Sequence, residues 1–308
     1  MLKRFELHNH TTHSDASLTC LDLIEHVEKD RVDVFALTDH NTISGHRVVR
    51  ELLSSRPSGI QCIYGMEYTT YYGHILCLNL EKYVPWDSID RFHPEKLFEA
   101  CKEAGALTGI AHPFSYGAPF ARGCRFEMTV HDFSHVDFIE VFNNLEPLHE
   151  VNGRGLDWWE QLVLEGKHLA HTCGMDLHGR WDMHMHFATY IDCTEEETPA
   201  ESLARAIRTM QTYVSKGLLL HAEKKGETWH FSLENVHKSG FVSADRYLMT
   251  LRGRDVTKSY EISEEKALDL PEDLFPAGPV LIPKLYLSTP DGEAHLEQLI
   301  CISPPIYR

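Results

Sequence analysis

Two histidines close to the start of the chain, His8 and His10, alternate within the segment Glu6-Leu7-His8-Asn9-His10. In a β-strand, side chains two residues apart point to the same face, so the two imidazoles can reach a single point. Such a pair can chelate a divalent metal ion, which is the first chemistry that the sequence offers. The chain has 21 histidines, so one pair can arise by chance and its interpretation depends on residues later in the chain.

Further metal-competent residues recur along the chain, each just after a short apolar run that predicts a β-strand. The runs cover residues 32–37, 60–64, 106–110 and 168–173, and they are followed by Asp39, His40, Glu67, His112, Asp176 and His178. Side chains that follow parallel strands gather at one end of a β/α barrel. We therefore expect these residues to converge with the two N-terminal histidines on one metal site.

The elements that must position these residues alternate between strand and helix over about the first two hundred residues. Helices are predicted at residues 17–29, with Ser17 as the N-cap, and at 44–53, 94–104, 156–164 and 199–210. Further strands are predicted at 74–78, 138–142 and 188–191. This alternation favours parallel βα units, and ligands after several strands favour a closed or nearly closed barrel. An open doubly wound sheet is the alternative, but it would gather only groups near its switch point.

The residues beyond Gly217 differ in character, because short β-like runs alternate there with Gly, Pro, Asp and charged segments. These runs lie at residues 228–233, 246–251, 280–282 and 284–287. They predict a smaller β-rich region packed on the barrel. The expected organisation is a barrel domain at 1–217 and a β-rich domain at 218–308. The segment 114–135 has little periodicity, and we expect it to be a loop that covers the active site.

The composition describes an ordinary globular chain of 308 residues, with 43% hydrophobic and 24% charged residues. A net charge of −17 opposes binding of extended nucleic acid. A small anionic substrate stays possible where bound cations supply local positive charge. Eight scattered cysteines suit reduced thiols, and neither a secretory segment nor a membrane span is found. We expect a cytoplasmic protein with no membrane partner and leave its oligomeric state open.

Taken together, these motifs resemble those of the PHP (polymerase and histidinol phosphatase) superfamily of metal-dependent hydrolases. The resemblance rests on His8-Asn9-His10, Ser14-Asp15, Thr38-Asp39-His40-Asn41, Glu67, Ala111-His112-Pro113 and Asp176-Leu177-His178. It implies an α/β fold, a distorted (β/α)7-type barrel with a smaller C-terminal β-rich region. A narrower similarity to the CehA/McbA-like branch rests on residues 139–143 and 152–159, on Gly166, on the Asp176 motif and on the terminal Pro305-Ile306-Tyr307.

The resemblance also implies two or three divalent metal ions, for which Zn²⁺, Mn²⁺ and Fe²⁺ suit the mixture of imidazoles and carboxylates. The implied ligands of the first ion are His8, His10, Glu67 and Asp176. Glu67 would bridge to a second ion that also binds His74 and His112, and a third would bind Asp15, His40 and His178. Asp15, Ala16 and Met175 depart from the residues that are common in the family, but none of these departures removes a ligand.

Other residues are assigned supporting roles around this centre. Asp39 is expected to orient a neighbouring ligand, as carboxylates beside metal-bound imidazoles commonly do. His178, His149 and a metal-bound water are the candidates for the general acid. Arg154 is a candidate for binding phosphate bidentately, together with Arg122, Arg125 and Arg180. His184 and His186 form a second alternating pair, which is expected to lie outside the site because it lacks a companion carboxylate.

Two ions that share a carboxylate can hold a hydroxide between them, and this hydroxide can attack phosphorus or an activated carbonyl. Our leading hypothesis is a metal-dependent phosphoesterase that hydrolyses a small phosphate ester or nucleotide. The alternative enzyme is an amide, carbamate or ester hydrolase whose pocket is lined by Phe114, Tyr116, Phe120, Trp158 and Trp159. A metal-binding module without turnover is the alternative from a different class.

Overall fold

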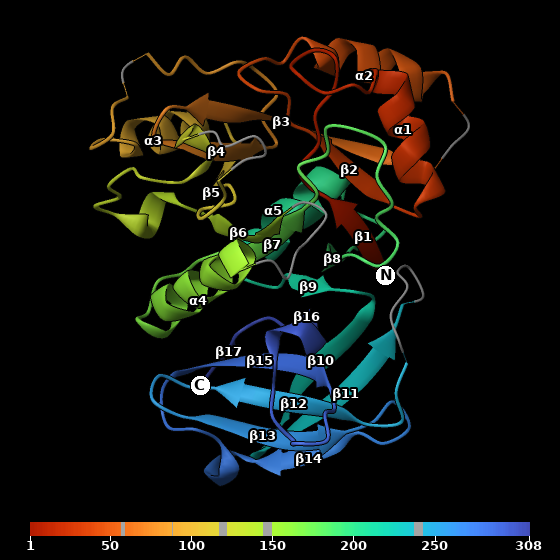
Figure 1. Ribbon diagram of the computed structural model, residues 1–308, viewed down its shortest axis with the longest axis vertical. Coiled ribbons are helices and arrows are strands. Elements are labelled where there is room, and N and C mark those ends of the chain that lie inside the picture. The colour runs from red at the N-terminus through yellow and green to blue at the C-terminus, as the bar shows by residue number, and fades with distance from the viewer. Residues whose placement is uncertain (57–58, 88, 117–121, 144–149, 237–242) are drawn as a thin grey trace.

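The structure is a computed structural model that describes residues 1–56, 59–87, 89–116, 122–143, 150–236 and 243–308 (Figure 1). The N-terminal strands and the helices α1 to α5 lie in the upper part of the view in Figure 1. The C-terminal strands form a separate layer below them, and α4 runs along the boundary between the two parts. The candidate ligands all come from the upper part.

A nearly closed barrel forms the upper part. β1 (Leu2–Glu6), β2 (Val34–Leu37) and β3 (Gln61–Thr70) are parallel, as are β5 (Leu107–Ile110), β6 (Phe138–Asn143) and β7 (Ala170–Gly174). β4 (Gly73–Leu78) lies between these two groups and is antiparallel to both neighbours. The barrel closes where Asn9, beyond β1, pairs in parallel with Leu177, beyond β7. The predicted α/β barrel is confirmed, with one reversed strand, and the open doubly wound alternative is wrong.

Five α-helices cover the outside of this barrel in the described part of the chain: α1 (Cys20–Lys29), α2 (Gly45–Ser54), α3 (Glu95–Glu103), α4 (Glu150–Leu164) and α5 (Pro199–Arg208). Their apolar stripes pack on strands that are buried on both faces, such as the Val-Phe-Ala-Leu sequence of β2. Short 3₁₀ helices at Arg122–Cys124 and Phe133–His135 interrupt the predicted loop 114–135.

Two helix boundaries differ from the predicted ones for physical reasons. α1 begins at Cys20, because Thr19 and Asp22 form a capping box there. The predicted cap, Ser17, instead donates its hydroxyl hydrogen bond to the carbonyl of His178. α4 begins at Glu150, before the predicted start at residue 156, although Gly153 and Gly155 lower the helix propensity of its first turns. Contacts from the rest of the fold therefore decide where α4 starts.

The C-terminal part is β-rich, as predicted. β8 (Ala188–Asp192) pairs with β1, and β9 (Tyr213–Ser215) joins it to β16 (Leu299–Ile302), β15 (Val280–Leu287), β12 (Tyr247–Arg252) and β13 (Thr257–Ile262) in one sheet. β10 (Leu218–Lys225), β11 (Thr228–Asn235) and β14 (Leu268–Pro271) form a second sheet, and β17 (Ile306–Tyr307) pairs with β15. Since the β9 to β16 pairing joins the parts, the domain division after residue 217 stays a prediction.

Two of the predicted strands at residues 280–287 are a single strand, β15, that continues through Pro283. The Pro283 carbonyl accepts a hydrogen bond from the Ser303 amide, so the missing N–H of Pro283 faces the same side, at the end of the β16 ladder. The proline therefore interrupts little of the pairing. Among the described residues, no helix has the length and apolar character that a membrane crossing requires.

Candidate metal centre

The predicted metal ligands all lie at one end of the barrel. His8 and His10 follow β1, His40 follows β2, His112 follows β5, and Asp176 and His178 follow β7. Glu67 was predicted to follow its strand but lies inside β3, which continues to Thr70. His74 lies at the start of β4, and because β4 runs antiparallel to its neighbours, its start reaches the end of the barrel where they finish. The reversed strand therefore brings His74 to the other ligands.

The first group consists of His8, His10, Glu67 and Asp176, whose ligand atoms all lie within 4.8 Å of one another. His8 Nε2 lies 3.3 Å from Glu67 Oε2 and 3.4 Å from Asp176 Oδ1. His10 Nε2 lies 2.9 Å from Asp176 Oδ1 and 3.4 Å from Glu67 Oε2. These four residues are the ones predicted from the sequence to bind the first ion.

Glu67 belongs to a second group as well, with His74 and His112. Its Oε1 atom lies 2.9 Å from His74 Nδ1 and 3.0 Å from His112 Nε2, while its Oε2 atom faces the first group. The two oxygens of one buried carboxylate thus face two sets of imidazoles. This is the geometry that the predicted bridging role of Glu67 requires.

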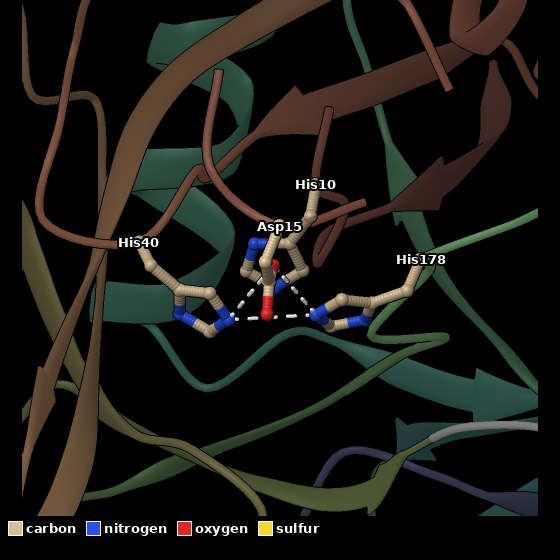
Figure 2. A group of neighbouring side chains, drawn as sticks. All are labelled: His10, Asp15, His40 and His178. Carbon is tan, nitrogen blue, oxygen red and sulfur yellow. Dashed lines mark hydrogen bonds and ion pairs between the residues drawn. The ribbon is translucent and has the colours of Figure 1, made fainter. Parts of the chain in front are cut away.

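The third group consists of His10, Asp15, His40 and His178. Figure 2 shows the rings of His40 and His178 on either side of the Asp15 carboxylate, with His10 behind it. Asp15 Oδ1 lies 3.2 Å from His178 Nε2 and 3.5 Å from His40 Nε2. The Asp15 side chain is 60% exposed and that of His178 is 30% exposed, whereas Glu67 is fully buried. The third group is therefore the part of the centre that faces solvent.

Three of the ligand imidazoles are oriented through their second ring nitrogen. His8 Nδ1 lies 2.9 Å from Glu140 Oε1, His112 Nδ1 lies 3.0 Å from the carbonyl of Cys124, and His178 Nδ1 lies 2.8 Å from the carbonyl of Asp176. In each ring the Nε2 atom is left facing the carboxylates of the centre. A hydrogen bond of this kind fixes the tautomer and the direction of a metal-binding histidine.

Glu140 has a role that was not predicted from the sequence. Its Oε1 atom lies beside His8, and its Oε2 atom accepts a hydrogen bond of 3.0 Å from the backbone amide of His112. One carboxylate thus connects a ligand of the first group to a ligand of the second. A feature of the sequence could have predicted this role. Glu140 is the acidic residue in the otherwise apolar run Phe138-Ile139-Glu140-Val141-Phe142, and a buried charge in a strand needs partners.

Asp39 contacts the loop that carries two ligands. Its carboxylate accepts hydrogen bonds from the backbone amide of Thr11 at 2.7 Å and from the hydroxyl of Ser14 at 2.8 Å. These partners belong to the segment between His10 and Asp15 and are not imidazoles. Asp39 therefore holds this segment, and its predicted orienting role acts through the backbone that carries the two ligands.

The backbone at two ligands is strained. His112 has a φ of 27° and Asp176 has a φ of 49°, values that residues with a Cβ atom rarely adopt. Such conformations cost about 1–3 kcal/mol and persist only where the surrounding structure enforces them. Here the enforcing contacts include the bonds of His112 to Glu140 and Cys124 and the bridge between Asn9 and Leu177. The strain places both side chains at the end of the barrel.

The charges of the centre require compensation. Burial opposes ionisation of Glu67, but the neighbouring His8 and His74 outweigh it and hold the pKa of this carboxyl well below its usual range. Burial also disfavours the charged form of His112, yet Glu67 and Asp176 raise the pKa of this imidazole to about 9. Burial lowers the pKa of His10 to about 4. Among the described ligands, only protonated imidazoles carry the positive charge that balances the buried carboxylates.

The residues fit divalent metal ions. His8 Nε2 is buried and forms no hydrogen bond within the described structure, although it faces the carboxylates of Glu67 and Asp176. A buried polar atom without a hydrogen bond is costly, and this one belongs to a group whose ligand atoms converge. Imidazole nitrogens and carboxylate oxygens are the donors that divalent transition metals accept. Ions between the three groups would satisfy His8 Nε2 and balance the charge.

The predicted arginines occupy different positions. Arg180 is exposed and pairs with Asp22 on α1. Arg154 is exposed on the first turns of α4, and its catalytic role stays a prediction. Arg125 is exposed next to Cys124, and its backbone pairs with that of Phe114, two residues after His112. The side chain of Arg122 and the candidates Phe120 and His149 lie outside the described residues.

A family model for the PHP domain matches residues 6–220, a span that contains every predicted metal ligand. The chain belongs to the PHP domain family. The family predicted from the sequence is thus confirmed, and with it the expectation of a metal-dependent hydrolase. The narrower prediction of the CehA/McbA-like branch is not tested by this match and stays a prediction.

Two curated relatives of this PHP chain match part of it. An uncharacterised protein of Methanocaldococcus jannaschii, MJ1587, is 30% identical over 122 residues, which are 40% of this chain and 64% of that protein. A 5′-3′ exoribonuclease of Haemophilus influenzae is 35% identical over 89 residues, which are 28% of this chain and 32% of that enzyme. The chain therefore spans less than two thirds of the length of these relatives.

A solved structure shares the fold over almost the whole chain. It is a two-domain protein of Bacteroides vulgatus that contains a predicted PHP-like metal-dependent phosphoesterase. The TM-score is 0.58, the sequence identity is 15%, and the match covers 99% of this chain and 95% of that protein. At this identity the likeness concerns the fold alone.

Proposed function

We propose that this PHP chain is a metal-dependent phosphoesterase that hydrolyses a small phosphate monoester or nucleotide. The observation that supports the proposal most directly is the Glu67 carboxylate, whose two oxygens face two different groups of imidazoles. This arrangement suits two ions held a short distance apart, as in two-metal phosphatases. The identity and number of the ions, with Zn²⁺, Mn²⁺ and Fe²⁺ as candidates and a third ion at His10, Asp15, His40 and His178, belong to the same proposal.

When bound, divalent ions supply a nucleophilic water at neutral pH and positive charge for the oxygens of the substrate. The protein supplies the rest. Since the third group is the exposed part of the centre, substrate reaches it over Asp15 and His178. His178 Nδ1 donates to the carbonyl of Asp176, so Nε2 faces Asp15 on the exposed side of the centre. In the protonated ring, Nε2 can give its proton to the leaving oxygen where no third ion occupies it.

Arg125 is the arginine that best fits contact with a phosphate. Arg125 is exposed, whereas Arg180 pairs with Asp22, in a chain that carries 46 acidic and only 29 basic residues. Its backbone is fixed beside a ligand, because Cys124 binds His112 and Arg125 pairs with Phe114. A guanidinium placed at the rim can bind two phosphate oxygens.

The packing of Trp158 and Trp159 argues against the predicted aromatic pocket for an acyl substrate. Trp159 is fully buried against His171, with a ring separation of 4.4 Å. Trp158 packs among Phe114, Phe126 and Phe133. Both indoles therefore serve the core more than a pocket. The amide, carbamate or ester hydrolase remains the second candidate only because the same centre can attack a carbonyl.

The proposal is tested with protein stripped of metal and reloaded with Mn²⁺, Zn²⁺ or Fe²⁺. The reloaded protein is assayed on p-nitrophenyl phosphate, a nucleoside 5′-monophosphate, a short 5′-phosphorylated RNA and an aryl carbamate. We expect metal-dependent release of phosphate from the two small esters. The RNA is included because one relative is an exoribonuclease, and preferred cleavage of RNA would contradict the predicted absence of an extended nucleic-acid substrate. Hydrolysis of the carbamate alone would refute the phosphoesterase.

Matched variants connect activity to named residues. Glu67→Gln should abolish phosphate release, whereas Glu81→Gln, at an exposed glutamate that pairs with Arg50, should leave it unchanged. Arg125→Gln should lower kcat/KM about tenfold, because one charge-assisted contact is lost. Arg180→Gln is its control, since Arg180 pairs with Asp22. Metal binding without turnover on any of these substrates would favour the non-catalytic module.

A further inference from the structure

A buried carboxylate on α4 faces two cations from the C-terminal strands. Glu160 is fully buried, and its Oε1 atom lies 2.6 Å from Nζ of Lys284 on β15. Its Oε2 atom contacts the guanidinium of Arg252 on β12. Lys284 is only 10% exposed, so this ion pair is largely removed from water. A desolvated carboxylate with two cationic partners resists being moved away from them, because separation leaves an uncompensated charge.

The C-terminal part touches α4 a second time, at its first turns. A Cβ atom at Gly153 would lie 2.8 Å from Cδ2 of Leu296, so the helix and the segment before β16 are in close contact there. Gly153 and Glu160 are seven residues apart, which is about 10 Å along a helix. The C-terminal part therefore contacts α4 at two points along its length, in addition to the packing of α4 on β6 of the barrel.

The first turns of α4 also contact the metal centre through one asparagine pair. Asn152 accepts a hydrogen bond of 3.3 Å from the backbone amide of Asn143, and its side-chain amide donates one of 3.0 Å to the Asn143 carbonyl. The Asn143 side chain in turn donates a hydrogen bond of 3.2 Å to Asp176 Oδ2. Asp176 is one of the two ligands with a positive φ, so the direction of its side chain depends on contacts of this kind.

We propose that Glu160 is a positioning residue for the metal centre. The ion pairs of Glu160 with Lys284 and Arg252 hold α4, α4 holds Asn152, and Asn152 with Asn143 directs Asp176 toward the metal. The C-terminal region would then be required for tight metal binding although it contributes no ligand. This inference rests on the metal centre of the proposed function, and nothing in the family match reaches the two cations, since that match ends at residue 220.

The test measures Mn²⁺ affinity in the 308-residue chain by calorimetric titration of Glu160→Gln and Lys284→Met. Both substitutions keep the approximate shape of the side chain while removing its charge. We expect the dissociation constant for Mn²⁺ to rise about tenfold in each variant, a typical size for coupling through a packed helix. Lys224→Met is the matched control, because Lys224 forms a 2.7 Å ion pair with Glu272 inside the C-terminal part, away from α4. It should leave the affinity unchanged.

A double-mutant cycle separates positioning from loss of stability. Asn152→Ala should also weaken Mn²⁺ binding, and the double variant Glu160→Gln/Asn152→Ala should bind about as weakly as either single variant, because both break the same connection. In the metal-free protein, amide hydrogen exchange at residues 152–156 should be faster in Glu160→Gln than in the wild type. Unchanged Mn²⁺ affinity with a lower Tm, or additive effects in the cycle, would overturn the positioning role. Absence of Mn²⁺ binding by the wild type would instead refute the proposed centre, and the exchange measurement would still decide whether Glu160 orders α4.

Discussion

At the scale of single residues, the centre depends on carboxylates that each serve two partners. Glu67 faces two groups of imidazoles, and Glu140 accepts from the ring of His8 and from the backbone of His112. A carboxylate that contacts two groups of ligands makes their positions depend on each other, because its two oxygens move together. Substitution at Glu140 should therefore affect metal binding even though its carboxylate is not among the predicted ligands.

Glu140→Gln should weaken Mn²⁺ binding by about 10–100-fold, the usual cost of removing a carboxylate behind a metal-binding histidine. Glutamine keeps the shape and can still accept from the His112 amide, so the fold should persist. The dissociation constant by titration and the circular dichroism spectrum would be compared with the wild type. A variant that binds Mn²⁺ as tightly as the wild type would show that His8 needs no orienting partner.

At the scale of secondary-structure elements, strand ends position the ligands and a glycine allows them to meet. A Cβ atom at Gly174, the last residue of β7, would lie 2.5 Å from the Cβ of His8 and 2.9 Å from Oε1 of Glu140. No side chain fits in that space. β7 can therefore approach β1 closely enough for Asp176 to reach His8 only because residue 174 is glycine.

Gly174→Ala should lower the free energy of unfolding by about 1–3 kcal/mol, as overpacking does, and should weaken Mn²⁺ binding by displacing His8. Urea unfolding and a Mn²⁺ titration measure the two effects. Gly59→Ala is the control, since nothing lies within 4 Å of a Cβ atom there. Equal stability and affinity in both variants would contradict the tight contact between the two strands.

β7 also carries His171, a buried histidine whose pKa is lowered in the folded chain. Burial lowers the pKa of His171 to about 4 from an ordinary 6.5. Its ring packs on Trp159 and lies 3.2 Å from the carbonyl of Ile302, neither of which titrates. The unfolded chain binds a proton here below pH 6.5, and the folded chain does so only near pH 4. Stability therefore falls as the pH drops through this window.

The contribution of His171 to this fall is about 3 kcal/mol between pH 6.5 and pH 4. His171→Gln does not titrate in that range, so its free energy of unfolding should depend less steeply on pH than that of the wild type. Urea unfolding at several pH values across the window gives both curves. Parallel curves for the two proteins would show that His171 already has an ordinary pKa in the folded state.

At the scale of the whole molecule, metal binding and folding should be coupled. The ligands come from several strand ends between residues 8 and 178, and the barrel closes only where Asn9 meets Leu177. Unfolding separates these ligands, so the ions bind the folded chain alone. Metals should therefore stabilise the barrel as a unit.

Free Mn²⁺ at about one hundred times its dissociation constant should add about 2.7 kcal/mol to the free energy of unfolding. For a chain of 308 residues, Tm should rise by about 4 °C and return to its original value with EDTA. Differential scanning calorimetry measures the shift, and Asp176→Asn, which lacks one ligand charge, should show a smaller one. An unchanged Tm at saturating Mn²⁺, Zn²⁺ and Fe²⁺ would contradict a centre that spans the barrel.

The sequence by itself determined the family, the α/β barrel and the set of side chains that converge. His8, His40, His112 and Asp176 follow apolar runs, and this order of residue types can be recognised in the sequence alone. The tertiary structure alone decided how the set is held together. Glu140 and Asn143 act across strands that are distant in sequence, β4 is reversed, and Glu160 of α4 pairs with Lys284 of the C-terminal part. The periodicity of apolar residues predicts which face of an element is buried. Contacts between distant elements depend on which buried faces pack together, and the tertiary fold alone determines that.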